Sequence, residues 1–273
     1  MKNKYAKAAC LLAGTLFLFG AAYMETGKNV FAGHDFILQA HRGLSQRCPE
    51  NTAASFQAAA KRKEFQGIET DIQETADGVL VLYHDSDISK KTDASGRICD
   101  YTYKELQEIH IINANNSEKY PEEKIPILEE FLDICRESGK IPYLELKSLT
   151  KEGMYRLIEI LDEGNWQNRC VITSFNQTLI EMFRSLNDSY PIEYMIDKNT
   201  AYRIEDVAAY LSLQENMVFR PNAYVVTEED VKYCKKLQIP VECFGLKTGD
   251  KKRLFELKKM GVTGVTCNDY KGL

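Results

Sequence analysis

The chain has 273 residues, of which 44% are hydrophobic and 27% are charged, and its formal net charge is −5 at pH 7. This composition is typical of a globular protein with enough residues for one substantial core. The small negative charge and the lack of a basic tract argue against nucleic acid as a partner, and no GxxxxGK[ST] segment indicates a P-loop nucleotide site.

The first residues of the chain differ from the rest. Lys2, Lys4 and Lys7 precede a run from residue 8 to residue 24 that carries no charge. A basic stretch before an apolar one is the pattern of a secretory signal, although the run is slightly short for a bilayer span of about 20 residues. We expect residues 1–33 to be a signal peptide, with an uncleaved membrane anchor as the alternative. In both cases we expect export, with the protein either secreted or held at the cell surface.

Seven cysteines follow the apolar run. No two of them are close enough for a CxxC metal or redox motif, and an odd number cannot all pair within one chain. We expect most of them to be small buried hydrophobic residues, with one disulfide bond left open as an alternative.

Residues 34–273 form one expected domain, in which β-rich runs alternate with helical patterns. The expected strands are Phe36–Ala40, Gly67–Ile72, Val79–His84, Pro142–Lys147, Cys170–Ser174, Ile192–Ile196, Met217–Phe219, Val241–Phe244 and Gly264–Cys267. The expected helices are Thr52–Lys63, Leu128–Glu137, Lys151–Glu163, Gln177–Leu186, Glu228–Leu237 and Lys251–Met260. This alternation indicates βαβ units and a parallel sheet.

The size of the domain favours an α/β fold of the (β/α)8 or TIM-barrel class, which typically has roughly 250 residues. A doubly wound parallel sheet produces the same local pattern and is the alternative. In a barrel, functional residues gather at the C-terminal ends of several strands. His41, Glu69, His84 and Glu145 all lie at or near such ends, which favours the barrel.

The segment from Ser86 to Pro126 interrupts the alternation. It is rich in Ser, Asp, Lys and Asn. We interpret it as a short insertion after the second or third strand that crosses the mouth of the barrel and has no core of its own.

Two of the expected strands carry paired charges. Glu69 and Asp71 flank Thr70, so the alternation of a strand places both carboxylates on one face. Two such acids repel each other unless a cation or a proton lies between them, and oxygen ligands suit Ca²⁺ or Mg²⁺. Glu145 and Lys147 repeat the spacing on a later strand. Each pair alone is also compatible with a solvent-exposed ion pair, but two such strands in one series favour a metal site.

His41 and His84 each follow an apolar run and each precede a charged residue, Arg42 and Asp85 respectively. A single histidine in such a place is often structural. A pair suits general acid–base catalysis, because imidazole titrates near neutral pH. The planar guanidinium of Arg42 matches phosphate oxygens, with a surface salt bridge as the alternative.

Together these residues resemble the successive motifs of the glycerophosphodiester phosphodiesterase family, whose members are PLC-like phosphodiesterases with a TIM barrel. The resemblance extends from Phe36 to the C-terminus. The motifs that carry it are His41-Arg42-Gly43, Pro49-Glu50-Asn51-Thr52, Glu69-x-Asp71, Asp77-Gly78, His84-Asp85, Ile125-Pro126-x-Leu128-Glu129-Glu130, Glu145-Leu146-Lys147 and Thr173-Ser174-Phe175.

The resemblance implies an enzyme that hydrolyses glycerophosphodiesters to an alcohol and glycerol 3-phosphate with one divalent metal ion, Ca²⁺ or Mg²⁺. The expected substrate is a small glycerophosphodiester or a glycerol-phosphate polymer. The implied roles are metal ligation by Glu69, Asp71 and Glu145, acid–base catalysis by His41 and His84, phosphoryl contacts from Arg42 and Lys147, and support of the substrate site by Glu50.

Two stretches depart from the family pattern. Where many relatives have Trp-Thr-Val-Asn, this chain has Val241–Leu246, in which Phe244 can replace the aromatic ring for substrate binding but the Asn is absent. The last strand ends in Cys267-Asn268-Asp269-Tyr270, where relatives have Thr-Asp followed by Pro. Both lie on the substrate side of the barrel, so the alcohol that is released stays open.

Two other functions remain as alternatives. A phospholipase D-like or C-like lipid phosphodiesterase on the same barrel would share the histidines and the metal. A non-catalytic barrel that binds a glycerophosphate would not need two proton carriers, so the presence of both His41 and His84 argues against it.

Overall fold

The computed structural model describes residues 30, 31 and 33–270. The expected signal or anchor segment therefore lies almost wholly outside the described residues. Within the described part of the chain, no helix combines the length and the apolar composition that crossing a membrane requires.

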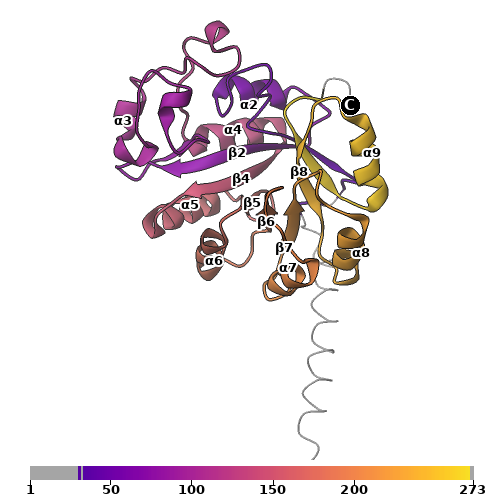
Figure 1. Cartoon of the computed structure of the whole chain (residues 1–273). Helices are drawn as coiled ribbons and strands as arrows, with labels where there is room; N and C mark the ends of the chain where they lie inside the picture. Colours follow the sequence, from indigo (N-terminus) through magenta and orange to yellow (C-terminus); the bar gives the residue numbers. More distant parts are fainter. Residues whose placement is uncertain (1–29, 32, 271–273) are drawn as a thin grey trace, which may run out of the picture.

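Eight parallel strands form the wall of a barrel (Figure 1). Their order around the wall is β7-β6-β5-β4-β2-β1-β9-β8, and two isolated parallel bridges, Phe219 to Val241 and Asn222 to Phe244, join the ends of the sheet. The strands are β1 (Ile37–Ala40), β2 (Gly67–Glu74), β4 (Ile141–Ser148), β5 (Val171–Ser174), β6 (Ile192–Ile196), β7 (Met217–Pro221), β8 (Glu242–Leu246) and β9 (Gly264–Cys267).

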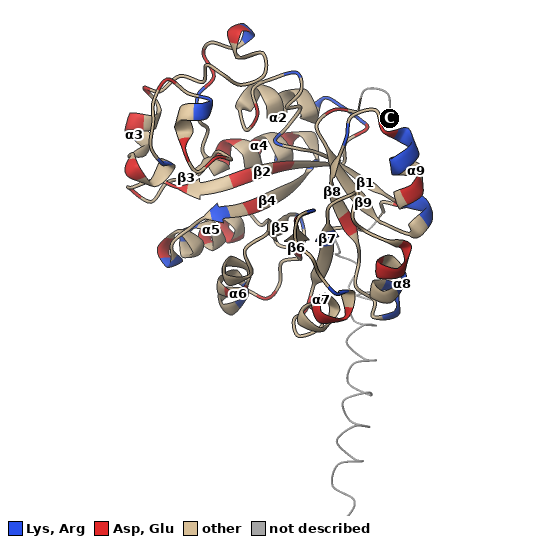
Figure 2. Ribbon diagram, viewed as in Figure 1, with Lys and Arg blue, Asp and Glu red and all other residues tan. Residues whose placement is uncertain are grey.

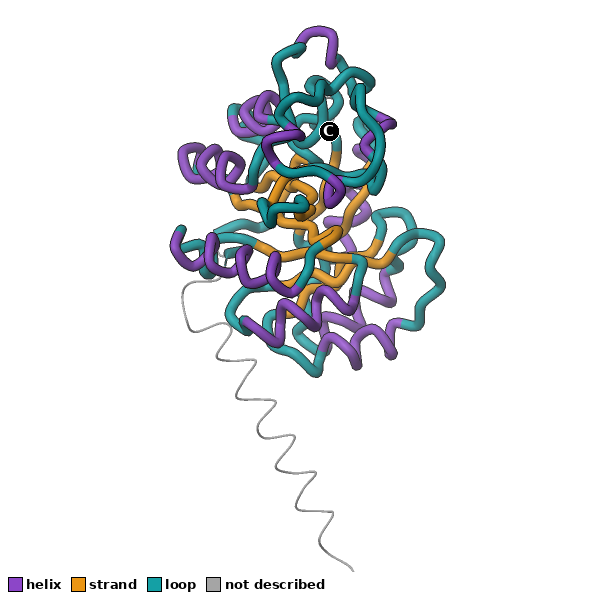
Figure 3. The backbone as a smooth tube through the Cα atoms, turned by 90° about the vertical axis from the view of Figure 1, so that its left-hand side faces the viewer, coloured by secondary structure: helices purple, strands orange, loops and turns teal. Residues whose placement is uncertain are grey.

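Helices cover the outside of this wall (Figure 3). They bury apolar faces against the strands; α5, for example, buries Met154, Leu157 and Leu161. Most begin at a residue whose side-chain oxygen accepts a backbone N–H of the first turn, as Thr150 does for α5. The helices are α2 (Ala53–Ala60), α4 (Leu128–Ser138), α5 (Lys151–Glu163), α6 (Gln177–Leu186), α7 (Ile204–Leu211), α8 (Glu228–Lys236) and α9 (Lys251–Met260).

The predicted (β/α)8 barrel is thus confirmed over the doubly wound sheet, and every predicted strand and helix has a counterpart. The sequence pattern missed α7, which is short and whose N-cap residue, Arg203, forms no side-chain cap. Six of the seven described cysteines are buried and all seven are free, so the prediction of buried thiols is confirmed.

The strand predicted at Val79–His84 is not a barrel strand. It forms β3 (Leu80–Leu82), which pairs antiparallel with β2. Only residues 75–79 separate the two strands, and a parallel crossover needs a dozen residues or more, so the chain can only turn back as a hairpin. His84 therefore reaches the site from the end of a hairpin, not from the C-terminal end of a barrel strand.

The insertion after β3 differs from its prediction. It contains η1 (Ile88–Lys90), η2 (Ile98–Asp100), α3 (Tyr103–Leu106) and η3 (Ser117–Lys119). The expectation that it lacks a core was wrong, because the few apolar residues spread through this polar segment gather into one small cluster with β3. The cluster consists of Val81, Tyr83, Ile88, Ile98, Leu106, Ile109 and Ile125.

The insertion also touches the loop between β1 and α2 and the first turn of α2, at one side of the barrel mouth. Asn115 Nδ2 donates to the carbonyl of Ser45 at 2.9 Å, and the backbone N–H of Ala54 donates to Glu123 Oε2 at 3.2 Å. The insertion is therefore attached to the segment that carries His41 and Arg42.

The middle of the barrel is polar. Arg220 on β7 is fully buried and bonds with Glu193 on β6, Gln39 on β1 and Thr266 on β9. Gln39 also donates to Glu242 on β8. One arginine thus links strands from several sides of the wall.

Candidate active site

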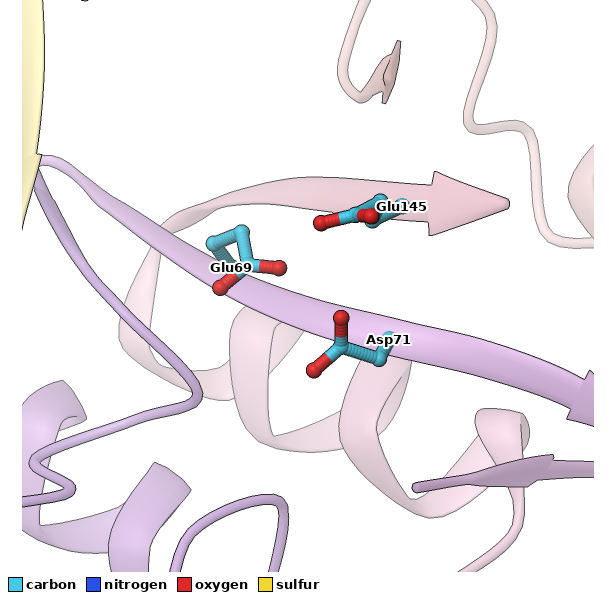
Figure 4. A group of neighbouring side chains, drawn as sticks. All are labelled: Glu69, Asp71 and Glu145. Atoms are coloured by element: carbon cyan, nitrogen blue, oxygen red, sulfur yellow. The ribbon is translucent and has the colours of Figure 1, made fainter. Parts of the chain in front are cut away.

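Three carboxylates from two neighbouring strands point toward one another (Figure 4). Glu69 and Asp71 lie on β2, and Glu145 lies on β4 directly opposite Asp71 in the parallel register. Ligand oxygens of the three residues lie within 4.8 Å of one another, and all three residues are buried. The predicted alternation of Glu69 and Asp71 onto one face is confirmed, and Figure 2 shows the acidic positions along both strands.

The three carboxyl groups do not have equal affinities for a proton. Burial, together with the neighbouring Asp71, raises the pKa of Glu145 to about 7 and that of Glu69 well above its usual value. Burial also acts to raise the pKa of Asp71, but Arg42 and Lys147 outweigh it and lower this pKa to about 2. A cation placed between the three groups would relieve the repulsion that raises the pKa values of Glu145 and Glu69.

Two cations border the carboxylates. Lys147 Nζ lies 2.7 Å from Glu145 Oε1 and 3.6 Å from Asp71 Oδ1. Arg42 Nε lies 3.2 Å from Asp71 Oδ2, and the backbone N–H of Arg42 donates to Glu69 Oε2 at 2.9 Å. Arg42 and Lys147 therefore offer positive charge on two sides of the same group of oxygens.

The loop after β1 adopts an unusual backbone that brings Arg42 into place. Arg42 and Gly43 both have positive φ, 55° and 75°. A Cβ at Gly43 would lie 2.6 Å from the backbone carbon of Ser55, so only glycine fits where the loop packs against α2. Ser55 in turn donates its hydroxyl to the carbonyl of Arg42 at 3.0 Å.

Both histidines are anchored through Nδ1. His41 Nδ1 lies 2.7 Å from Asn268 Oδ1, and His84 Nδ1 lies 3.0 Å from Asp85 Oδ1. His41 Nε2 lies 4.0 Å from Glu69 Oε2. Burial and the neighbouring Arg42 lower the pKa of His41 to about 4, and burial lowers that of His84 as well. Nδ1 of each ring is therefore engaged by a side-chain oxygen, which orients the imidazole.

Glu50 lies beside Arg42 at the rim. Its Oε1 accepts from Arg42 Nη1 at 2.8 Å and from Lys91 Nζ at 2.7 Å. The side chain therefore orients an arginine that faces the carboxylates.

Phe244 lies elsewhere on the mouth. Its ring meets Phe175 edge-on, with 5.2 Å between the ring centroids. Phe175 also lines a cavity of about 340 Å³ with Met195, Asp197 and other residues at the ends of β5 and β6. The mouth thus has a charged side on β2 and β4 and a more apolar side near β5, β6 and β8.

Three supporting residues escaped prediction. Asn51 donates from Nδ2 to Asp71 Oδ2 at 2.8 Å and accepts from Thr70 at its Oδ1. Asn268 holds His41, and Lys91 holds Glu50. Asn51 stands inside the quoted Pro49–Thr52 motif, which was a usable signal, whereas only tertiary contacts identify the other two.

Comparison with known proteins places the chain in a family. Residues 41–271 match the model of the glycerophosphoryl diester phosphodiesterase family. Glycerophosphodiester phosphodiesterase of Caldanaerobacter subterraneus subsp. tengcongensis is 30% identical over 238 residues, covering 85% of this chain and 94% of that protein. Glycerophosphodiester phosphodiesterase 1 of Bos taurus is 30% identical over 190 residues, covering 66% of this chain and 57% of that protein. The chain thus spans little more than half the length of this mammalian relative.

Solved structures share the fold. A phosphodiesterase of Oleispira antarctica in complex with sn-glycerol-3-phosphate has a TM-score of 0.74 at 23% identity, covering 86% of this chain and 93% of that one. A glycerophosphodiester phosphodiesterase of Thermotoga maritima has a TM-score of 0.69 at 21% identity, covering 87% and 96%. With the match over residues 41–271, the chain belongs to the glycerophosphoryl diester phosphodiesterase family.

Proposed function

We propose that this chain hydrolyses glycerophosphodiesters to an alcohol and glycerol 3-phosphate, with one divalent ion, Ca²⁺ or Mg²⁺, held by Glu69, Asp71 and Glu145. The observation that carries the proposal is the convergence of these buried carboxylates with Arg42 and Lys147 at the barrel mouth. The Oleispira antarctica relative, whose structure contains sn-glycerol-3-phosphate, supports the same product.

The donor atoms fit such an ion. Glu69 Oε1 and Asp71 Oδ1 are buried and accept no hydrogen bond within the described part of the protein. Buried polar atoms that accept no hydrogen bond are costly, and oxygen-only ligands are those that Ca²⁺ and Mg²⁺ prefer. When bound, a divalent ion would offset negative charge on the phosphoryl group and favour deprotonation of a hydroxyl held against it.

The protein's own groups would supply the remaining chemistry. Arg42 and Lys147 would bind the phosphoryl oxygens and offset their charge as it grows in the transition state. A glycerol hydroxyl of the substrate would attack phosphorus and lose its proton to one of His41 and His84, while the other protonates the departing alkoxide. This step yields the free alcohol and a cyclic phosphodiester. Water then opens the ring with the histidine roles reversed, which yields glycerol 3-phosphate.

The test is a panel of glycerophosphodiesters with different alcohols, assayed with chelator, with Ca²⁺ and with Mg²⁺. We expect chelation to abolish release of glycerol 3-phosphate and one of the two ions to restore it. Full activity in excess chelator would contradict the metal assignment. An intact lysolipid in the same panel separates the diesterase from the alternative lipid phosphodiesterase.

We further propose that the protein is exported and that residues 1–33 serve as a signal peptide or as an anchor through residues 8–24. The support is the order of Lys2, Lys4 and Lys7 before the uncharged run. N-terminal sequencing of protein from the cell exterior distinguishes a cleaved leader from a retained anchor. Recovery of the full-length chain only from the cell interior would contradict export.

A further inference from the structure

Lys91, in the insertion, forms an ion bridge between two carboxylates at the rim of the site. Its Nζ lies 2.7 Å from Glu50 Oε1 and 2.9 Å from Asp85 Oδ2, while only 22% of its side chain is exposed. Glu50 belongs to the loop between β1 and α2, and Asp85 follows the hairpin strand β3. One ammonium group therefore joins two segments that meet only in the folded protein.

Each of these carboxylates orients a residue of the proposed site. Glu50 Oε1 lies 2.8 Å from Arg42 Nη1, and Asp85 Oδ1 lies 3.0 Å from His84 Nδ1. Without a cation between them, both carboxylates would face each other across the rim with one partner fewer, and each would be free to turn toward water. Lys91 therefore affects the side chains of Arg42 and His84 indirectly, through Glu50 and Asp85.

The backbone of Lys91 is held firmly by the insertion. Its carbonyl accepts the N–H of Ile112 at 2.9 Å, and the next residue, Thr92, pairs antiparallel with Ile111. The buried Thr92 also donates its hydroxyl to the carbonyl of Ile88, a fully buried member of the small cluster. The core of the insertion therefore supplies a rigid base for this side chain.

We propose that Lys91 is a positioning residue of the site, which fixes Arg42 for the phosphoryl group and His84 for proton transfer through Glu50 and Asp85. This inference rests on the proposed diesterase function. It gives the insertion a part in the reaction: its small core holds a cation at the rim of a site that otherwise belongs to the barrel and the hairpin.

The neighbouring Lys90 provides a matched control. Its side chain is 67% exposed, and its Nζ lies 3.8 Å from Asp85 Oδ1 without a contact to Glu50 among the described residues. Lys90→Met removes the same charge one position away, so it controls for net charge and for the substitution itself.

The kinetic test compares Lys91→Met, Lys90→Met, Asp85→Asn and the double variant Asp85→Asn/Lys91→Met, each after its melting temperature is measured. Loss of a group that orients a metal ligand typically costs about 10–100-fold, and Arg42, which Glu50 holds, contacts two of the proposed ligands. We expect such a loss in kcat/KM for Lys91→Met and less than about a twofold change for Lys90→Met. Because Lys91 acts partly through Asp85, the double variant should lose less than the product of the two single losses.

Two kinetic outcomes overturn the proposal. In the first, Lys91→Met folds and has the same kcat/KM as Lys90→Met. In the second, the loss of kcat/KM in the double variant equals the product of the losses in Asp85→Asn and Lys91→Met. If Lys91→Met does not fold, Lys91→Gln takes its place in the same comparison, with the same two outcomes decisive.

A second readout is independent of turnover. The chain has only four histidines, so the ring signals in an NMR spectrum can be assigned, with that of His84 identified by its loss in His84→Ala. We expect this signal to shift in Lys91→Met and to stay in place in Lys90→Met. An unmoved His84 signal in folded Lys91→Met overturns the proposal. A shifted signal in a protein without turnover of any diester would instead contradict the proposed function and leave the positioning supported.

Discussion

Asp71 receives contacts from more sides than the other two carboxylates of the site. Asn51 donates to it at 2.8 Å, and Arg42 and Lys147 approach its oxygens at 3.2 Å and 3.6 Å. These partners outweigh its burial, which explains why its pKa falls to about 2 while that of Glu145 rises to about 7. A single residue thus stays charged in an acidic group where its neighbours resist ionisation.

At the same scale we predict that His41→Ala and His84→Ala each lower kcat by about 10²–10⁴-fold, the usual contribution of a positioned acid or base. Both rings lie at the rim, 33% and 30% exposed, so little packing is lost and the melting temperature should change little. The measurement is kcat on glycerophosphocholine beside a thermal unfolding curve. His110→Ala is the control, since its side chain is 54% exposed and pairs with Asp93 in the insertion. Wild-type kcat in either variant would remove that histidine from the mechanism.

At the scale of elements, the loop between β1 and α2 combines a strained turn with close packing. Arg42 and Gly43 both lie in the left-handed region, and Thr52 caps α2 by accepting from the backbone of Ser55. The Thr52 cap stabilises the start of α2, and Ser55 of α2 contacts the turn formed by Arg42 and Gly43. The loop that presents Arg42 is therefore stabilised by local contacts rather than by the sheet alone.

We predict that Gly43→Ala lowers the free energy of unfolding by about 2–5 kcal/mol, from left-handed strain of about 1–2 kcal/mol plus overpacking of about 1–3 kcal/mol. The overpacking arises because its Cβ would lie 2.5 Å from Ser55 Oγ. Gly139→Ala isolates the strain, since Gly139 has a φ of 67° but no atom within 4 Å of the added Cβ. Urea unfolding measures both variants. Equal losses in the two would contradict the steric argument.

The insertion shows how an element can differ from the pattern of its sequence. Its polar composition suggested a loop without a core, yet Ile88, Ile98 and Leu106 are fully buried together with residues of β3. Spacing along the chain did not reveal this cluster, because its members follow neither a helical nor a strand period. Only the hairpin made by β2 and β3 supplies the surface on which they gather.

At the scale of the whole molecule, the buried Arg220 links polar and charged side chains of several strands inside the barrel. Its guanidinium bonds with Glu193, Gln39 and Thr266 and lies 3.7 Å from Glu242. Burial raises the pKa of both Glu193 and Glu242. Arg220 therefore offsets negative charge on Glu193 and Glu242 in a region that is buried from solvent.

We predict that Arg220→Met lowers the free energy of unfolding by about 3–5 kcal/mol, because removing one partner of a buried ion pair leaves uncompensated charge. Arg203→Met is the control, since Arg203 is 73% exposed and its ion pairs are at least 3.8 Å long. Exposed pairs of this kind contribute about 0–1 kcal/mol. Chemical denaturation of both variants provides the comparison, and a stable Arg220→Met would argue that the two glutamates are held neutral.

The amino-acid sequence by itself determined the eight barrel strands, most of the helices, the barrel as the favoured class and the placement of Glu69 and Asp71 on one face. These features depend on the periodicity of apolar residues and on residues two positions apart, and both can be read from short segments of the sequence. Tertiary structure alone decided the partner of His41 and the contacts of Lys91. Asn268 lies 227 positions from His41, and Lys91 lies 41 positions from Glu50. No local pattern encodes such contacts, because closing the barrel and folding the insertion are what bring these atoms within hydrogen-bonding distance.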